Sequence, residues 1–293
     1  MIDTGTATGG LAEFQSARPR LFGIAYRILG SATDAEDVLQ ETWIHWQGAD
    51  RTAVRNPTAF LSTITTRLAL NAATSARARR VSYVGPWLPE PVLTGHDPAL
   101  GAERAEAVEL GLLMLLQRLT PNERAAFLLR EAFDYPHGEI ADILGTSEAN
   151  ARQLARRARA HVDRERAGQV PAAEHDRLLR AFLAAARTGD LDRLKALLSE
   201  DVVFYSDGGG VVSAARRPVT GRDQVARFLA GVMRKLGKPV SSDLVNANGR
   251  EAFTLARGDS VLVLGAIDAA PSGVRRVYFV RNPAKLGAVR PPS

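Results

Sequence analysis

The chain has 293 residues, with 38 Lys or Arg against 32 Asp or Glu, so its formal net charge is +6 at pH 7. This length fits two or three domains, and the basic excess is compatible with nucleic-acid binding without proving it. The absence of cysteine excludes disulfides, thiolate zinc sites and cysteine catalysis. No apolar run reaches membrane-spanning length, and the first residues, MIDTGTATGG, lack a signal-peptide core. We therefore expect a cytoplasmic protein with no membrane partner.

A first helical block is expected from about residue 11 to residue 80. An apolar stripe begins at Phe14 and stops at Gly30. Ser31 precedes a second helix over residues 34–43, whose acids cluster in the first turns, where the helix dipole favours negative charge. After Pro57 a long helix runs to Arg80, polar in its N-terminal half and without any acid.

Residues 81–102 are rich in proline and include Trp87-Leu-Pro-Glu-Pro91. The prolines preclude a continuous helix, so the stretch is predicted to be an extended, flexible linker. A tryptophan and a leucine are unusual in a solvated tether, which suggests that this linker docks on another part of the protein.

A second helical block is expected over residues 103–166. Thr120 and Glu123 form a capping box that starts a helix. Further on, Gly145 ends a short amphipathic helix, and Thr146-Ser147 caps the next one. In that next helix three apolar residues share one face, and amides and guanidinium groups occupy the opposite face. This pattern predicts a DNA-binding helix-turn-helix; the alternative is a helical hairpin with a solvated basic face.

The last block, residues 172–290, has a different pattern. A helix over residues 174–188 and a short helix after Asp190 precede four strand-like runs, at residues 202–206, 251–256, 261–267 and 274–280. A helix over residues 222–234 interrupts the strands, and residues 257–260 have the composition of a hairpin turn. This order predicts an α+β domain.

Together these blocks resemble a bacterial sigma factor of the extracytoplasmic-function type. The resemblance implies two all-α sigma domains, a helical bundle (region 2, residues 11–80) and a helix-turn-helix domain (region 4, residues 103–166), joined by the linker 81–102. It also implies that core RNA polymerase and promoter DNA are the partners. Residues 34–43 resemble the helix that docks on core polymerase, which assigns docking to Asp34, Glu36, Asp37, Gln40, Glu41 and Trp43.

Two segments resemble the promoter-recognition units of that family. The −10 unit would capture unpaired bases and phosphates through Asn56, Thr58, Ser62, Thr65, Thr66, Arg67, Arg77, Arg79 and Arg80. The −35 unit would contact duplex DNA through Asn150, Arg152, Gln153, Arg156, Arg157 and Arg159.

The last block resembles a SnoaL-like domain, a cone-shaped α+β fold, through residues 182–191, 201–210 and 219–222. Sigma factors with such a fused domain share three short motifs with this chain, which imply a regulatory contact between domains. The residues are Trp87, Leu88, Pro89, Glu90, Pro91, Asp207, Gly208, Gly209, Gly210, Asn282, Pro283, Lys285 and Leu286. The sequence departs from the pattern at Ala284, where an acid is expected, and at Val211, where a lysine is common.

The resulting hypothesis is an alternative sigma factor regulated by its own C-terminal domain. No catalytic residue, metal or cofactor is expected. In the last block, Asp207 lies among glycines that suit a turn, and His175 is expected at the surface. An unknown small ligand of the C-terminal domain remains open. The competing hypotheses are a ligand-responsive helix-turn-helix repressor, which leaves the helix at residues 34–43 unexplained, and a SnoaL-like enzyme with a DNA-binding appendage.

Overall fold

The computed structural model describes residues 4–94, 109–166, 168–237 and 240–289, with the backbone alone over residues 4–9 and 77–81. These residues divide into two compact units. The first comprises residues 4–81 and 112–165, and the second comprises residues 82–94, 109–111 and the chain from residue 166 onward. Among the described residues, no helix is both long and apolar enough to cross a membrane.

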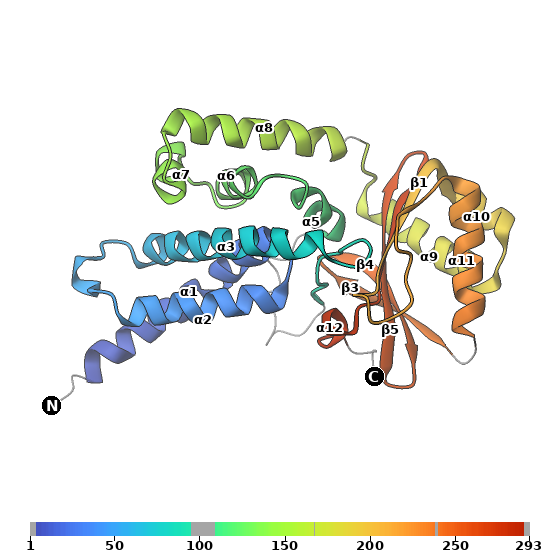
Figure 1. Ribbon diagram of the computed structural model, residues 1–293, viewed down its shortest axis with the longest axis horizontal. Helices are drawn as coiled ribbons and strands as arrows, with labels where there is room; N and C mark the ends of the chain where they lie inside the picture. The colour runs from blue at the N-terminus through green and yellow to red at the C-terminus, as the bar shows by residue number, and fades with distance from the viewer. Residues whose placement is uncertain (1–3, 95–108, 167, 238–239, 290–293) are drawn as a thin grey trace. The chain divides into compact units, whose positions relative to one another are not determined.

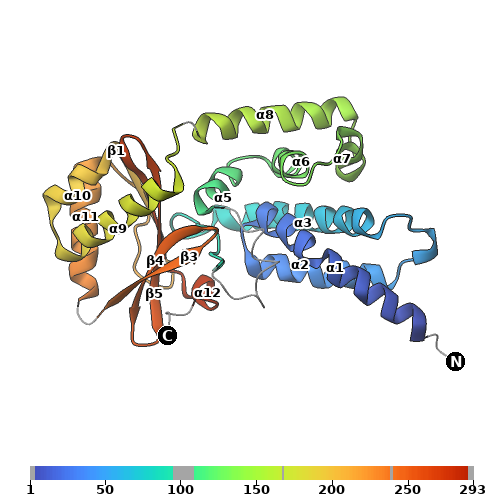
Figure 2. The same cartoon turned by 180° about the vertical axis from the view of Figure 1, so that it is seen from behind.

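The first unit begins with three helices that lie side by side, α1 (Thr4–Leu29), α2 (Ala32–Gln47) and α3 (Pro57–Val81), with a short 3₁₀ turn at Arg51–Ala53 (Figures 1 and 2). Gly30 ends α1 with a φ of 71°, and the Ser31 hydroxyl accepts the Asp34 N–H at 3.1 Å, which caps α2. The helix begins at Ala32, two residues before the predicted start. The core between these helices includes Leu21, Ile28, Leu39, Trp46 and Leu61.

Four further helices complete this unit: α5 (Leu110–Leu116), α6 (Pro121–Glu131), α7 (His137–Leu144) and α8 (Glu148–Arg166). The predicted capping box of Thr120 and Glu123 is present at the start of α6. Gly145 ends α7 in the left-handed conformation, and the Ser147 hydroxyl caps α8 by accepting the Asn150 N–H at 3.2 Å. The helix-turn-helix predicted from the sequence is therefore confirmed.

The second unit has one six-stranded sheet in the order β2-β1-β6-β5-β4-β3. Its strands are β1 (Leu198–Asp207), β2 (Val219–Thr220), β3 (Ser241–Ala247), β4 (Arg250–Arg257), β5 (Ser260–Ala270) and β6 (Gly273–Val280). Among these described strands, β1 and β6 alone pair in parallel, and Arg257 pairs with Ser260 across the predicted hairpin turn. The sheet confirms the α+β prediction; β2 and β3 had no strand pattern that the sequence analysis identified.

Helices α9 (Ala172–Thr188), α10 (Leu191–Leu197) and α11 (Arg222–Leu236) pack on one face of this sheet (Figure 1). The core between them includes Leu179, Phe182, Val225, Phe253 and Val277. A short helix, α12 (Pro283–Leu286), follows β6, and Asn282 caps it by accepting the Ala284 N–H at 3.1 Å. This arrangement leaves the carboxyl ends of β1 and β6 adjacent, because the two strands are parallel neighbours.

Candidate functional site

The residues predicted to dock on polymerase fall into two groups on α2. Asp37, Gln40 and Glu41 are exposed at helical spacing, and Ile44 extends the same face with 66% of its surface exposed. We call Asp37, Gln40, Glu41 and Ile44 the α2 stripe. The sequence analysis overlooked Ile44, although its spacing of three and four residues from Glu41 and Gln40 was visible in the sequence.

The other predicted docking residues of α2 make contacts inside the first unit or are less exposed. Glu36 pairs with Arg18 at 2.6 Å, and the Trp43 ring lies 5.0 Å from that of Phe14. Asp34 is half-buried in the first turn. These three residues are less exposed than the α2 stripe, and their docking role stays a prediction.

Three hydroxyls predicted to contact DNA point into the bundle instead. Ser62, Thr65 and Thr66 are completely buried. Thr66 donates to the Ser62 carbonyl at 2.7 Å, and the Thr65 hydroxyl lies 3.1 Å from that of Thr42. Their spacing of three and four residues, continued by Ala69, is that of a buried helix face. We correct the prediction accordingly: in this structure they are inaccessible to DNA.

Arg67, also predicted to contact DNA, is occupied inside the first unit. Its Nε donates to the Ile143 carbonyl at 3.1 Å and its Nη2 to the Asp142 carbonyl at 2.8 Å. Both carbonyls are at the C-terminal end of α7, where the helix dipole favours a cation. This arginine thus joins α3 to the first helix of the helix-turn-helix.

The remaining −10 candidates lie at the two ends of α3. Asn56 and Thr58 are exposed at its start, and the Asn56 side chain accepts the Ala59 N–H at 3.1 Å. The side chains of Arg77, Arg79 and Arg80 lie outside the described residues.

All six −35 candidates are exposed on α8, opposite the buried face of Ala151, Leu154 and Ala158. Several already have partners. Arg152 pairs with Glu148 at 2.6 Å, Arg157 with Glu123 at 3.3 Å and Arg159 with Glu131 at 3.0 Å, while Asn150 donates to the Thr146 hydroxyl at 2.7 Å. Exposed ion pairs of this kind contribute at most about 1 kcal/mol, so phosphates can displace them.

Gln153 and Arg156 complete this surface. Among the described residues, neither has a hydrogen-bond or ion-pair partner on the protein. Of the six candidates, Gln153 and Arg156 can therefore bind DNA without first breaking a contact within the protein.

The proline-rich linker is bound to the second unit through Asp207, whose side chain is fully buried. One carboxylate oxygen accepts the Tyr83 hydroxyl at 2.6 Å and the Gly209 N–H at 3.0 Å. The other accepts the Leu88 N–H at 2.9 Å and the Lys285 ammonium at 2.7 Å. Four charge-assisted hydrogen bonds compensate this carboxylate for its loss of water.

Lys285 and Asn282 complete the site, which we call the linker dock: Asp207, Asn282 and Lys285. Lys285 donates to the Leu88 carbonyl and lies 4.2 Å from the centre of the Trp87 ring, and Asn282 donates to the Tyr83 hydroxyl at 3.0 Å. Gly209 has a φ of +64°, and a Cβ there would lie 2.5 Å from the Asn282 side chain. Lys285 is the cation that pairs with Asp207 in this site.

The linker continues along the edge of the sheet. The Asn248 N–H donates to the Val92 carbonyl at 2.8 Å, the Thr94 N–H donates to Asn246 at 2.9 Å, and Leu93 forms a bridge with Ala247. Residues 82–94 are therefore an ordered part of the second unit, and not the flexible tether that the proline content predicted. Leu88, Pro89, Glu90 and Pro91 are all buried.

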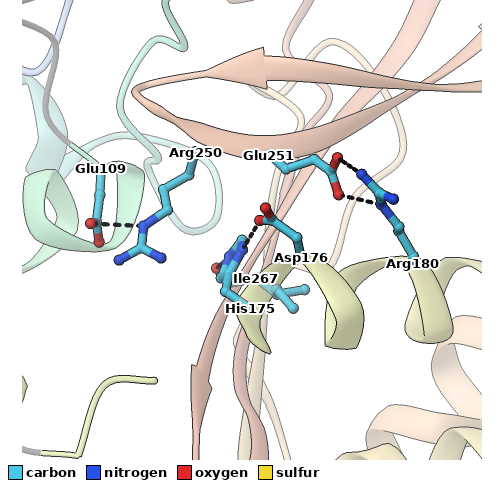
Figure 3. A network of polar contacts seen from close by, with 7 residues as sticks. All are labelled: Glu109, His175, Asp176, Arg180, Arg250, Glu251 and Ile267. Carbon is cyan, nitrogen blue, oxygen red and sulfur yellow. Dashed lines mark hydrogen bonds and ion pairs between the residues drawn. The ribbon is translucent and has the colours of Figure 1, made fainter. Parts of the chain in front are cut away.

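The expectation that His175 lies at the surface is wrong. It is 6% exposed, with Nδ1 3.0 Å from the Asp176 carboxylate and Nε2 3.3 Å from the Ile267 carbonyl (Figure 3). Neighbouring pairs join Glu109 to Arg250 at 2.8 Å and Arg180 to Glu251 at 2.6 Å. The cavity beside these residues has a volume of about 30 Å³, small compared with the roughly 300–1,000 Å³ typical of small-molecule sites.

Models of three protein families match the chain: "Sigma-70 region 2" over residues 14–79, "Sigma-70, region 4" over residues 109–162 and "SnoaL-like domain" over residues 179–280. The ECF RNA polymerase sigma factor SigJ of Mycobacterium tuberculosis is 39% identical over 269 residues, which cover 90% of this chain and 82% of SigJ. The probable ECF RNA polymerase sigma factor SigI of the same species is 34% identical over 212 residues, covering 70% of this chain and 73% of SigI. The crystal structure of SigJ superimposes with a TM-score of 0.75 and 35% identity, over 95% of this chain and 98% of that one.

Proposed function

Because this chain belongs to the extracytoplasmic-function family of RNA polymerase sigma factors, we propose that the α2 stripe binds core polymerase while α3 and α8 contact the two promoter elements. As a sigma factor, the protein binds core polymerase and promoter DNA, and it regulates transcription without being an enzyme itself. It acts in the cytoplasm, where bacterial polymerase meets the chromosome. A stand-alone repressor would have no use for region 2, so that alternative is not favoured.

The observation that supports polymerase docking is the composition of the α2 stripe. Two carboxylates, an amide and an exposed isoleucine share one face, which suits a basic partner surface with an apolar centre. Acidic groups there would increase the association rate and fix orientation, and Ile44 would supply buried area.

A direct test measures binding of the full-length protein to core polymerase by surface plasmon resonance. Ile44→Asp should weaken binding at least about tenfold, since it removes an apolar contact and adds a buried charge. Asp37→Asn with Glu41→Gln should mainly slow association at low salt. Glu13→Gln, an exposed acid on α1, is the matched control. Unchanged binding by all variants would contradict this role of α2.

The C-terminal domain is proposed to regulate the DNA-binding regions through the linker and to be non-catalytic. Asp207, the carboxylate best suited to catalysis, has both oxygens engaged by the linker dock and its partners. When the second unit holds residues 82–94, the segment that connects regions 2 and 4 spans a shorter distance. The distance between these two regions must match the fixed spacing of the two promoter elements. A domain that binds or releases this segment would therefore change promoter choice.

In vitro transcription with core polymerase tests both proposals. Templates come from start sites mapped after overexpression of the protein. Truncation after Arg166 removes the whole domain, whereas truncation after Asn282 removes residues 283–293, which include α12 and Lys285. The two should change promoter-dependent initiation differently. Equal activity of both truncations and the full chain would refute regulation by this domain, and no initiation by any form would contradict the sigma activity.

A further inference from the structure

The second unit contains an open cavity that the proposed function does not use. It has a volume of about 490 Å³ and lies between α11 and the sheet. This volume falls within the range of about 300–1,000 Å³ that is typical of small-molecule sites. All of its lining residues belong to the second unit.

The floor of the cavity is aromatic and aliphatic. Phe204 and Phe279 are almost completely buried, with ring centres 5.0 Å apart, and Phe228 lies 5.0 Å from Phe204. Val232 and Leu262 extend this apolar surface. Such a floor favours a hydrocarbon or aryl group and offers little to a sugar or a free nucleotide phosphate.

The rim carries only positive charge. Arg227 and Lys235 come from α11, Arg257 from the end of β4 and Arg281 from the residue after β6, and no described lining residue is acidic. Their hydrogen bonds go to neutral oxygens: Arg257 donates to the Leu236 carbonyl at 2.6 Å, and Arg281 donates to the Ser213 carbonyl. Among the described residues, none of the four forms an ion pair with a carboxylate.

Arg281 is the least solvated of these cations. It is half-buried, and its Nε is inaccessible to solvent and has no hydrogen-bond partner in the described structure. Burial lowers the pKa of its guanidinium from the ordinary value, since burial disfavours the charged form. An anion in the cavity would compensate the charge of this half-buried guanidinium.

We propose that this cavity is a binding site for an amphipathic anion, a molecule with an apolar body and a carboxylate or phosphate head. The apolar body lies against Phe204, Phe228 and Phe279, and the head is held by Arg281 and the rim cations. Ligand binding to this cavity can be measured without polymerase or DNA, so its test needs no transcription assay.

Isothermal titration calorimetry on the full-length protein uses decanoate and monodecyl phosphate as probes, with decan-1-ol as the neutral comparison. Both anions should bind at least about tenfold more tightly than the alcohol, since charge-assisted hydrogen bonds are made only by the anions. The tighter anion identifies the preferred head group. Binding of both anions no tighter than that of the alcohol would overturn the proposal.

Two variants with matched controls locate the site. Arg281→Gln should weaken anion binding about tenfold, whereas Arg234→Gln, on α11 but outside the cavity lining, should not. Gly231→Leu fills the cavity from α11, where an added Cβ meets no atom within 4 Å, and should abolish binding. Gly138→Leu, at an equally open position of α7, is its control. Wild-type affinity in both Arg281→Gln and Gly231→Leu would place binding elsewhere and contradict the proposal.

Discussion

At the scale of single residues, Thr120 controls the start of α6. Its hydroxyl accepts the Glu123 N–H at 3.3 Å, and its own N–H donates to the Glu123 carboxylate at 3.2 Å. Thr120→Ala should lower the free energy of unfolding by about 1 kcal/mol, as measured by denaturant titration. Thr74→Ala, in the exposed middle of α3, should cause no loss, since that hydroxyl only bonds back to the Leu70 carbonyl. Equal losses in both variants would contradict the cap assignment.

Glu123 should make this contribution depend on pH. Burial acts to raise the pKa of its carboxyl, but hydrogen bonds from Thr120 and the charge of Arg157 outweigh it, so the pKa lies below its ordinary value of 4.5. The carboxylate therefore stabilises the fold fully above that ordinary pKa, and the stabilisation is lost as pH falls through the lower, folded-state pKa. The difference in unfolding free energy between wild type and Glu123→Gln should be constant near neutral pH and shrink in acid. A difference that grows in acid would contradict this sign.

Ser62 shows why single polar residues mislead sequence analysis. Its hydroxyl is buried and has no hydrogen-bond partner in the described structure. Ser62→Ala should leave the unfolding free energy unchanged or raise it by up to about 1 kcal/mol, and should leave promoter melting intact. Thr65→Val removes a hydroxyl that Thr42 contacts and should cost about 1 kcal/mol. Loss of promoter melting in Ser62→Ala would restore the original assignment of this residue to DNA.

At the scale of elements, α8 carries two kinds of exposed arginine. Arg159 forms an ion pair with Glu131, whereas Arg156 has no ion-pair partner among the described residues. Arg156→Ala should weaken promoter binding by the polymerase complex about tenfold, as one lost base or phosphate contact would. Arg159→Ala should have a smaller effect, because that arginine is shared with Glu131. Gel-shift titrations at several salt concentrations distinguish a phosphate contact from a base contact. Loss of a phosphate contact reduces the slope of the logarithm of the binding constant against the logarithm of salt concentration by about one. Equal effects of the two variants would show that the ion pair does not matter.

The elements also show what the sequence could predict. Capping residues and glycines at helix ends located most helices, because caps act locally. The resemblance to the −10 unit assigned the hydroxyls of α3 to DNA, whereas packing of α3 against α1 and α2 buries Ser62, Thr65 and Thr66. Strand β3 was missed because it lies at the sheet edge, where Leu244 is exposed and alternation is weak.

The motifs shared with the family identified residues of the linker dock, but their geometry was not predictable. Three of the four partners of Asp207, namely Tyr83, Leu88 and Lys285, lie far from it in the sequence, and only tertiary folding brings them together. The same holds for Arg67, whose carbonyl partners are more than seventy positions away. Burial of His175 likewise depends on β5, which supplies the Ile267 carbonyl.

At the scale of the whole molecule, residues 82–94 of the linker belong to the C-terminal unit, although the linker connects the two DNA-binding regions. Asp207→Asn removes the charge that pairs with Lys285 and should cost about 3–5 kcal/mol, since it leaves a buried ammonium uncompensated. Limited chymotrypsin digestion should then cut at Tyr83 and Trp87 faster than in the wild type. Asp201→Asn, an exposed acid on the same strand, is the control. If the thermal melt of the second unit is the same in the Asp207→Asn variant and the wild type, faster cleavage reflects release of the linker and not unfolding. Unchanged cleavage in a folded Asp207→Asn protein would contradict the linker dock.

The turn after β6 contacts both the linker dock and the cavity. Arg281 extends its side chain to the cavity and donates its backbone N–H to the Asp207 carbonyl at 2.8 Å, and the next residue, Asn282, holds Tyr83. An occupant that shifts this turn would alter linker affinity, and thermodynamic linkage then requires the docked linker to alter the affinity for the occupant by the same factor. If core polymerase and promoter DNA release the linker from the dock, they would change the affinity of the cavity for its ligand. Promoter binding would then control ligand binding as strongly as the ligand controls promoter binding.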